Sequence, residues 1–140
     1  MLGPNWRRLD LGLLILRVGV GISFMHHGWP KMFGGPDRWA SLGGVMENVG
    51  ITFLPTLWGF MAAFSELIGG LCFVLGLFFR PACVLLTLTM IVAAISHFAK
   101  GDSYTVGSHA VEAAVLFVSM FLIGPGGYGV DVRLRSRRTG

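Results

Sequence analysis

Long runs of apolar residues, rather than an alternation of apolar and polar positions, dominate the chain. Each run has about the length that a helix needs to cross a bilayer, and formal charges within the runs are few. Continuous apolar runs favour helices, because a half-buried strand alternates apolar with polar residues. The runs lie at about residues 9–28, 54–79, 81–99 and 109–124. The sequence therefore predicts an all-α integral membrane protein with a four-helix bundle.

The connection between the first two spans has the pattern of a short amphipathic helix. Pro36 and Asp37 are typical of a helix start, with Asp37 expected to cap the first turn, and Gly50 is typical of a helix end. The apolar residues that fall near one face of this helix are Trp39, Leu42, Met46 and Val49. We expect a short interfacial helix on the outer surface between spans 1 and 2.

Composition excludes the main alternatives to a membrane protein. The chain has 140 residues, of which 54% are hydrophobic and 13% charged. A soluble domain is about 45–50% apolar and about 25% charged, so this composition excludes a water-soluble enzyme. It also excludes a disordered chain, because disordered chains are polar. The two cysteines form no CxxC pair and no disulfide framework. Residues 1–140 are expected to form a single transmembrane domain that ends in a basic tail at 130–140.

The distribution of basic residues predicts the orientation of the four spans. Seven of them fall on the side that holds both termini and the turn between spans 2 and 3, against three on the opposite side. Positive residues favour the cytoplasmic side, so both termini are expected there, and the positive charge is interpreted as a topology signal rather than nucleic-acid binding. The seven are Arg7, Arg8, Arg80, Arg133, Arg135, Arg137 and Arg138, and the three are Lys31, Arg38 and Lys100.

Two opposite charges within the spans are the most informative residues. Arg17 lies ten residues, about 15 Å, below His27, and Glu66 lies eleven residues, about 17 Å, below Pro55. This similar depth predicts an Arg17–Glu66 ion pair, because pairing offsets the desolvation of both groups. The pair has two interpretations of equal standing: a structural contact that fixes helix register, or a group that binds ligand or transfers protons.

The helical face of span 1 that carries Arg17 is small and aromatic. At 100° per residue, Phe24 and Lys31 share this face, whereas His27 falls at its edge and His26 on the far side. Such a face favours an apolar ligand or ordinary helix packing over a polar channel.

Further polar side chains are expected at the outer surface. His109 and Glu112 are three residues apart and therefore neighbours on one helical face, and His27 and His97 fall at the same level. His and carboxylate groups are metal ligands, but HxxxH and HExxH spacings are absent. We therefore predict no metal site, and a pocket for a polar head group is the alternative.

The order of short motifs across all four spans resembles the DoxX family of small bacterial membrane proteins. These motifs are Arg17, Phe24-x-x-His27-Gly28-Trp29-x-Lys31, Glu66-x-x-Gly69-Gly70, Gly76-Leu77, Arg80, His97, Glu112, Gly124-Pro125-Gly126 and Asp131. The resemblance implies a multi-pass, four-helix protein of the bacterial inner membrane. Members are commonly named oxidoreductases; some similar proteins are subunits of thiosulfate:quinone oxidoreductase, and others are linked to oxidative-stress complexes.

The leading hypothesis is an accessory protein or subunit of a quinone-linked membrane redox system. Arg17 or His27 would polarise a quinone carbonyl, and Glu66 or Glu112 would exchange protons. The sequence has no haem or flavin motif, so electrons would come from a redox partner protein. The residues expected to bind the ligand are Phe24, Trp29, Lys31, Trp58, His97 and His109.

Two other function classes stay open at this point. One is a non-catalytic membrane protein that holds a lipid-like molecule or a partner helix in a cavity lined by small residues. The other is a proton-coupled transporter, which with four spans per chain would need a homo-oligomer.

Overall fold

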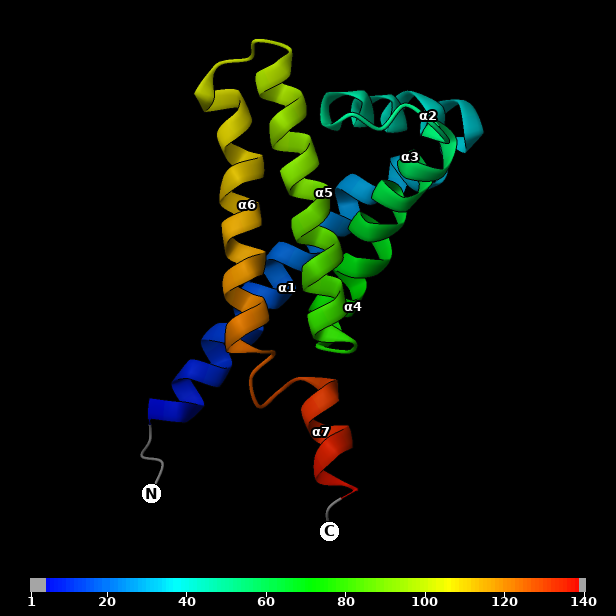
Figure 1. The fold of residues 1–140 in the computed structure, drawn as a ribbon. Coiled ribbons are helices and arrows are strands. Elements are labelled where there is room, and N and C mark those ends of the chain that lie inside the picture. The colour runs from blue at the N-terminus through cyan, green and yellow to red at the C-terminus, as the bar shows by residue number, and fades with distance from the viewer. Residues whose placement is uncertain (1–4, 139–140) are drawn as a thin grey trace.

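The computed structural model describes residues 5–138, and across that range the fold is all-helical (Figure 1). The predicted fold class is confirmed, because four helical segments in this range are long and apolar enough to span a membrane. They are α1 (Asn5–Met32), the continuous segment Pro55–Leu75, α5 (Phe79–Ala99) and α6 (Tyr104–Ile123).

The fourth span begins earlier than expected. Helix α6 starts at Tyr104 rather than near residue 109, and the first turn is fixed by the Gly107 amide, which donates to the Ser103 carbonyl at 3.1 Å. Glu112 therefore lies on the third turn of a membrane-length helix rather than near its outer end.

The predicted helix between spans 1 and 2 is present but divided. Helix α2 (Gly35–Gly43) is followed by a 3₁₀ turn, η1 (Gly44–Val49). Gly50, at φ 81°, ends η1, which confirms the predicted end of this helical segment. The expectation that Asp37 caps the helix is wrong: Gly34 occupies the N-cap, so Asp37 lies within the first turn, and no side chain caps it.

Helix α2 lies across α3 (Pro55–Phe64) at the end of the bundle away from the two termini, which is named the outer end after the predicted orientation (Figure 1). The crossing is very close, because a Cβ at Gly43 would overlap the Pro55 carbonyl and a Cβ at Gly59 would overlap the Trp39 carbonyl. The Trp39 indole also donates to the Lys31 carbonyl at 2.9 Å. The first turns of α3 therefore pack mainly against α2 rather than against α1.

Span 2 contains a π-helical turn, η2 (Ser65–Gly69), before it continues as α4 (Gly70–Leu75). Helix α1 packs against this part of the span: a Cβ at Gly28 would lie 2.8 Å from the Glu66 carbonyl carbon, and one at Gly70 would lie 3.0 Å from the Gly21 oxygen. Small residues allow this approach of the two backbones. The contact places Gly28 at the level of Glu66.

The core between the four spans is aromatic. The Phe117 ring lies 4.9 Å from the Phe24 ring and 5.2 Å from the Phe73 ring, both edge-to-face, and Phe73 stacks on Phe79 at 5.1 Å. Phe24 is thus a packing residue of the α1–α6 contact.

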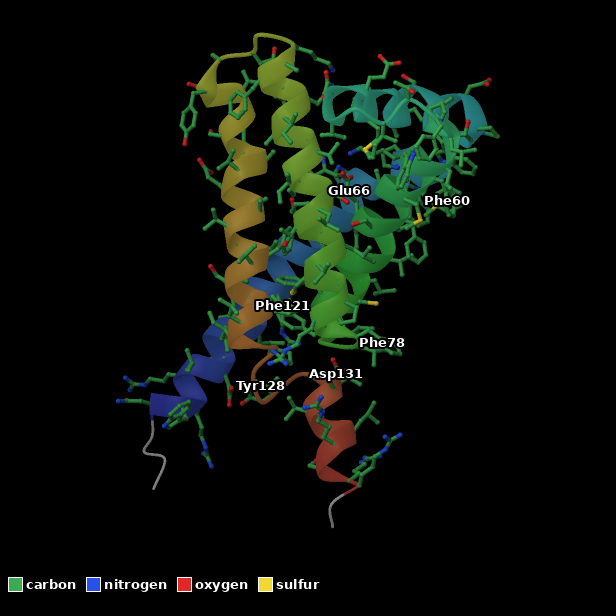
Figure 2. The ribbon with its side chains drawn as sticks, viewed as in Figure 1. Phe60, Glu66, Phe78, Phe121, Tyr128 and Asp131 are labelled. Carbon is green, nitrogen blue, oxygen red and sulfur yellow. The ribbon has the colours of Figure 1, made fainter. Side chains whose placement is uncertain are left out.

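The C-terminal segment is joined to the opposite end of the bundle through two carboxylates, of which Asp131 is labelled in Figure 2. Asp131, at the start of α7 (Val130–Ser136), accepts hydrogen bonds from the amides of Phe78 and Phe79 at 3.1 and 2.9 Å. Asp10 accepts one from the Gly127 amide at 2.7 Å. The last two residues of the predicted tail, 139–140, lie outside the described residues.

Candidate functional site

A cavity of about 460 Å³ lies between the outer end of α1, the α2–η1 segment, span 2 and α5. Its walls are mostly apolar, and it reaches from the π-helical turn of span 2 to the outer end of α5. The lining residues are Lys31, Leu42, Gly43, Val45, Met46, Trp58, Met61, Ala62, Ser65, Glu66, Leu85, Leu88, Thr89, Val92, Ala93, Ser96, His97 and Lys100.

An ion pair forms the polar end of the cavity. The Lys31 Nζ atom lies 2.7 Å from both carboxylate oxygens of Glu66. The Glu66 side chain is only 5% exposed, whereas that of Lys31 is 27% exposed. Glu66 lies in the π-helical turn η2, and turns of this kind are frequent at functional sites.

The walls carry one further polar contact. The Ser65 and Thr89 hydroxyls lie 3.0 Å apart, and Thr89 also donates to the Leu85 carbonyl at 2.9 Å. The Trp58 indole nitrogen donates to the Phe53 carbonyl at 3.0 Å, so its N–H is already satisfied and its apolar ring surface remains for a ligand.

Part of the cavity wall lies at the lateral surface of the bundle. Leu88 on α5 and Met61 on α3 both line the cavity, and they are 57% and 39% exposed. The exposed surface of a spanning helix meets acyl chains, so these two residues bring the cavity wall next to the bilayer.

A second polar group lies at the outer rim. The His97 Nδ1 atom is 2.7 Å from an Asp102 carboxylate oxygen, and the Asp102 amide donates to the His97 carbonyl at 3.1 Å. This contact ties the end of α5 to the loop before α6, and Lys100 lies on the same rim.

The predicted Arg17–Glu66 pair does not form. Both Glu66 oxygens are bonded to Lys31, and the fully buried Arg17 guanidinium has no hydrogen-bond partner among residues 5–138. It lies beside Gly76, where an added Cβ would overlap Nη1. The depth estimate failed because it assumed that His27 and Pro55 are level, whereas α2 inserts against the start of α3 and Gly28 is level with Glu66.

The cavity brings together only part of the predicted site. It is lined by Lys31, Trp58, Glu66 and His97, and the other predicted residues do not line it. Across the described part of the chain, no three His, Cys, Asp or Glu side chains lie close enough to hold a metal ion. The residues elsewhere are Arg17 and Phe24, which pack inside the bundle, and His27, Trp29, His109 and Glu112, which are exposed.

Several lining residues were absent from the prediction. Ser65 precedes Glu66 directly, and both residues of this π-helical turn line the cavity wall. Leu42 and Met46 also line the cavity. Their shared apolar face was predicted from the sequence, but it was expected to lie on the membrane surface.

Comparison with known proteins places these features in a family. The model of the DoxX family matches residues 12–99, a range that includes Lys31, Glu66 and His97. This chain belongs to the DoxX family. It is 36% identical over 90 residues to a Bacillus subtilis (strain 168) protein named "Putative oxidoreductase CatD", and the match covers 64% of this chain and 62% of that protein. No solved structure matches the chain.

Proposed function

We propose that this DoxX protein binds a quinone in the outer cavity, as an accessory protein or subunit of a membrane redox system. The observation that carries the proposal is the form of the cavity, which has apolar walls and one ion pair at the polar end. The exposed lining residues Met61 and Leu88 would form a side opening through which the ligand enters from the bilayer. A quinone has matching chemistry, with carbonyls at a planar head and an apolar tail. Most ligand cavities likewise combine apolar walls with a few convergent polar groups.

Lys31 is the group that would bind the quinone head. An ammonium has three N–H donors, and two of them are directed at the two Glu66 oxygens. The third is available for a carbonyl oxygen of the quinone. Glu66 would hold the ammonium in position and exchange protons with the bound head, while the Trp58 ring would contact the quinone ring.

The chemistry proposed for this chain is limited to binding, orientation and proton exchange. Reduction of a quinone to a quinol takes up two electrons and two protons, and the electrons would come from a redox partner protein. The oxidoreductase name of the Bacillus subtilis relative supports a redox context. The catalytic roles expected for Arg17, His27 and Glu112 are not carried forward, since these residues lie outside the cavity.

The location proposed for the protein is the bacterial cytoplasmic membrane, with both termini in the cytoplasm. The start of α1, the C-terminal helix α7 and the Phe78 turn lie at one end of the bundle (Figures 1 and 2). The exposed Arg7, Arg8 and Arg80 lie at that end, which supports the orientation because basic residues are retained on the cytoplasmic side.

The test is a titration of decylubiquinone into the protein in lipid nanodiscs, followed by tryptophan fluorescence. Lys31→Met should weaken binding about tenfold to a hundredfold, because a hydrogen bond from a charged donor contributes about 1.5–3 kcal/mol. Arg7→Met removes a charge far from the cavity and should leave the affinity unchanged. Equal affinity of Lys31→Met and wild type would contradict the proposal.

The same preparation distinguishes a quinone from a structural lipid. If native mass spectrometry finds a phospholipid that decylubiquinone does not displace, the cavity holds a lipid and the non-catalytic alternative replaces the quinone proposal.

A further inference from the structure

Glu112 is a charged residue on the outside of the bundle at the middle of a span. It lies eight residues, about 12 Å, from Tyr104 and eleven residues, about 16 Å, from Ile123. The side chain is exposed, and across residues 5–138 it takes part in no hydrogen bond or ion pair. A carboxylate at this depth would face acyl chains in a single copy of the chain.

This arrangement is unfavourable unless protein covers it. Ionisable groups within spans nearly always face protein or a water-filled cavity, because hydrocarbon neither solvates nor hydrogen-bonds them. Val115 and Leu122, which continue the same face of α6, are 61% and 72% exposed, and the opposite face packs against α5. Beyond Glu112, the exposed face of α6 therefore carries the apolar Val115 and Leu122 together with Ser119, and His109 lies one turn before Glu112.

The exposed face of α1 complements it. Gly12, Ile15, Gly19, Ile22 and His26 are all exposed and follow one another at alternating spacings of three and four residues. A Cβ at Gly12 or Gly19 would meet nothing within 4 Å, so another helix can approach there. Gly12 and Gly19 are seven residues apart and therefore lie on one face of α1, and small residues on a helical face let spanning helices pack closely.

Both polar groups lie in the half of their helix that is at the same end of the bundle. His26 lies six residues, about 9 Å, from Met32 at the outer end of α1. Glu112 lies eight residues, about 12 Å, from Tyr104 at the outer end of α6. A histidine ring has at least one N–H group whether it is neutral or charged, and this group can donate a hydrogen bond to a glutamate carboxylate.

We propose that the Glu112 face of α6 docks on α1 of a second copy of this chain, with Glu112 bonded to His26 of the partner subunit. The interface lies away from the quinone cavity, so the proposal stands independently of the function assigned to that cavity.

Disulfide cross-linking in membranes tests the contact. Two differently tagged copies, one with Glu112→Cys and one with His26→Cys, both in a Cys72→Ala, Cys83→Ala background, should give a mixed cross-linked dimer on oxidation. Leu88→Cys, which is exposed on α5 at the cavity opening, is the matched control and should give none with His26→Cys. Failure of the Glu112→Cys copy to cross-link above this control overturns the proposal.

Oligomer stability in nanodiscs or micelles provides the second test. Glu112→Leu should raise the dissociation constant of the oligomer roughly threefold to thirtyfold, as expected for loss of one interhelical hydrogen bond, whereas Glu112→Gln should largely retain it. If Glu112 faced lipid, leucine would leave the oligomer unchanged, and that result contradicts the proposal.

Discussion

The Lys31–Glu66 pair predicts an asymmetry between two single substitutions. Lys31→Met leaves the Glu66 carboxylate, which is 5% exposed, without its ionic partner, whereas Glu66→Gln leaves the Lys31 ammonium, which is 27% exposed. A lysine can extend its head towards the interface, but a short buried carboxylate cannot. The lysine substitution should therefore destabilise the protein more than the glutamate substitution.

The magnitudes follow from burial and hydrogen bonding. Removal of one partner of a buried pair costs about 3–5 kcal/mol, which we expect for Lys31→Met. Glu66→Gln keeps one acceptor oxygen for the lysine and should cost about 1–2 kcal/mol. The double variant Lys31→Met, Glu66→Leu removes both charges and should lie within about 1 kcal/mol of the wild type.

The assay is unfolding in mixed micelles of increasing SDS content, followed by circular dichroism. Lys100→Met, an exposed lysine at the cavity rim, is the control and should change stability by less than about 0.5 kcal/mol. The reasoning is refuted if Glu66→Gln costs as much as Lys31→Met, or if the double variant loses the sum of the two single losses. Because the double variant keeps the fold but lacks the donor, it should also bind quinone no better than Lys31→Met.

Three further predictions concern other parts of the fold. Arg17→Met removes a buried guanidinium that has no hydrogen-bond partner among residues 5–138, so it should leave stability in the micelle assay unchanged or raised, whereas a loss of about 3 kcal/mol would indicate an ion pair. Asp131→Ala removes the acceptor of the Phe78 and Phe79 amides and should cost about 1–2 kcal/mol, with faster hydrogen exchange at those amides; unchanged exchange would contradict the capping role. Leu88→Trp narrows the side opening and should weaken binding of a long-tailed quinone more than that of a tail-less analogue, and equal weakening of both would place the entrance elsewhere.

The membrane fold followed from the sequence because it depends on local properties. A span of about 20 apolar residues is recognisable without knowledge of its neighbours. The end of the interfacial helix at Gly50 was equally local, since a glycine in the left-handed region is a common stop.

The ion pair was mispredicted because it depends on how two helices align along the bundle axis. The estimate took the last residue of one apolar run and the first of the next as level. Contacts at Gly43 and Gly59 place α2 against the start of α3, and α1 packs mainly against the later turns of span 2. Lys31, rather than Arg17, is therefore beside Glu66, and such a shift has no signature in either helix alone.

The placement of Glu112 failed for a different reason. The residues from Tyr104 to Ser108 are too polar to extend an apolar run, so the sequence predicted that the fourth span begins at about His109. Helix α6 nevertheless begins at Tyr104, which moves Glu112 from the rim to mid-span.

The most direct test of the central claim is to locate a bound quinone on the chain. A photoreactive quinone analogue can be cross-linked to the protein in native membranes, and the labelled peptides identified by mass spectrometry. The account predicts labelling of the cavity segments around Met46, Trp58 to Glu66 and Leu88, with competition by unmodified quinone and loss in Lys31→Met. Labelling confined to the outer face of α6, or to the region of Arg17 and Gly76, would contradict it.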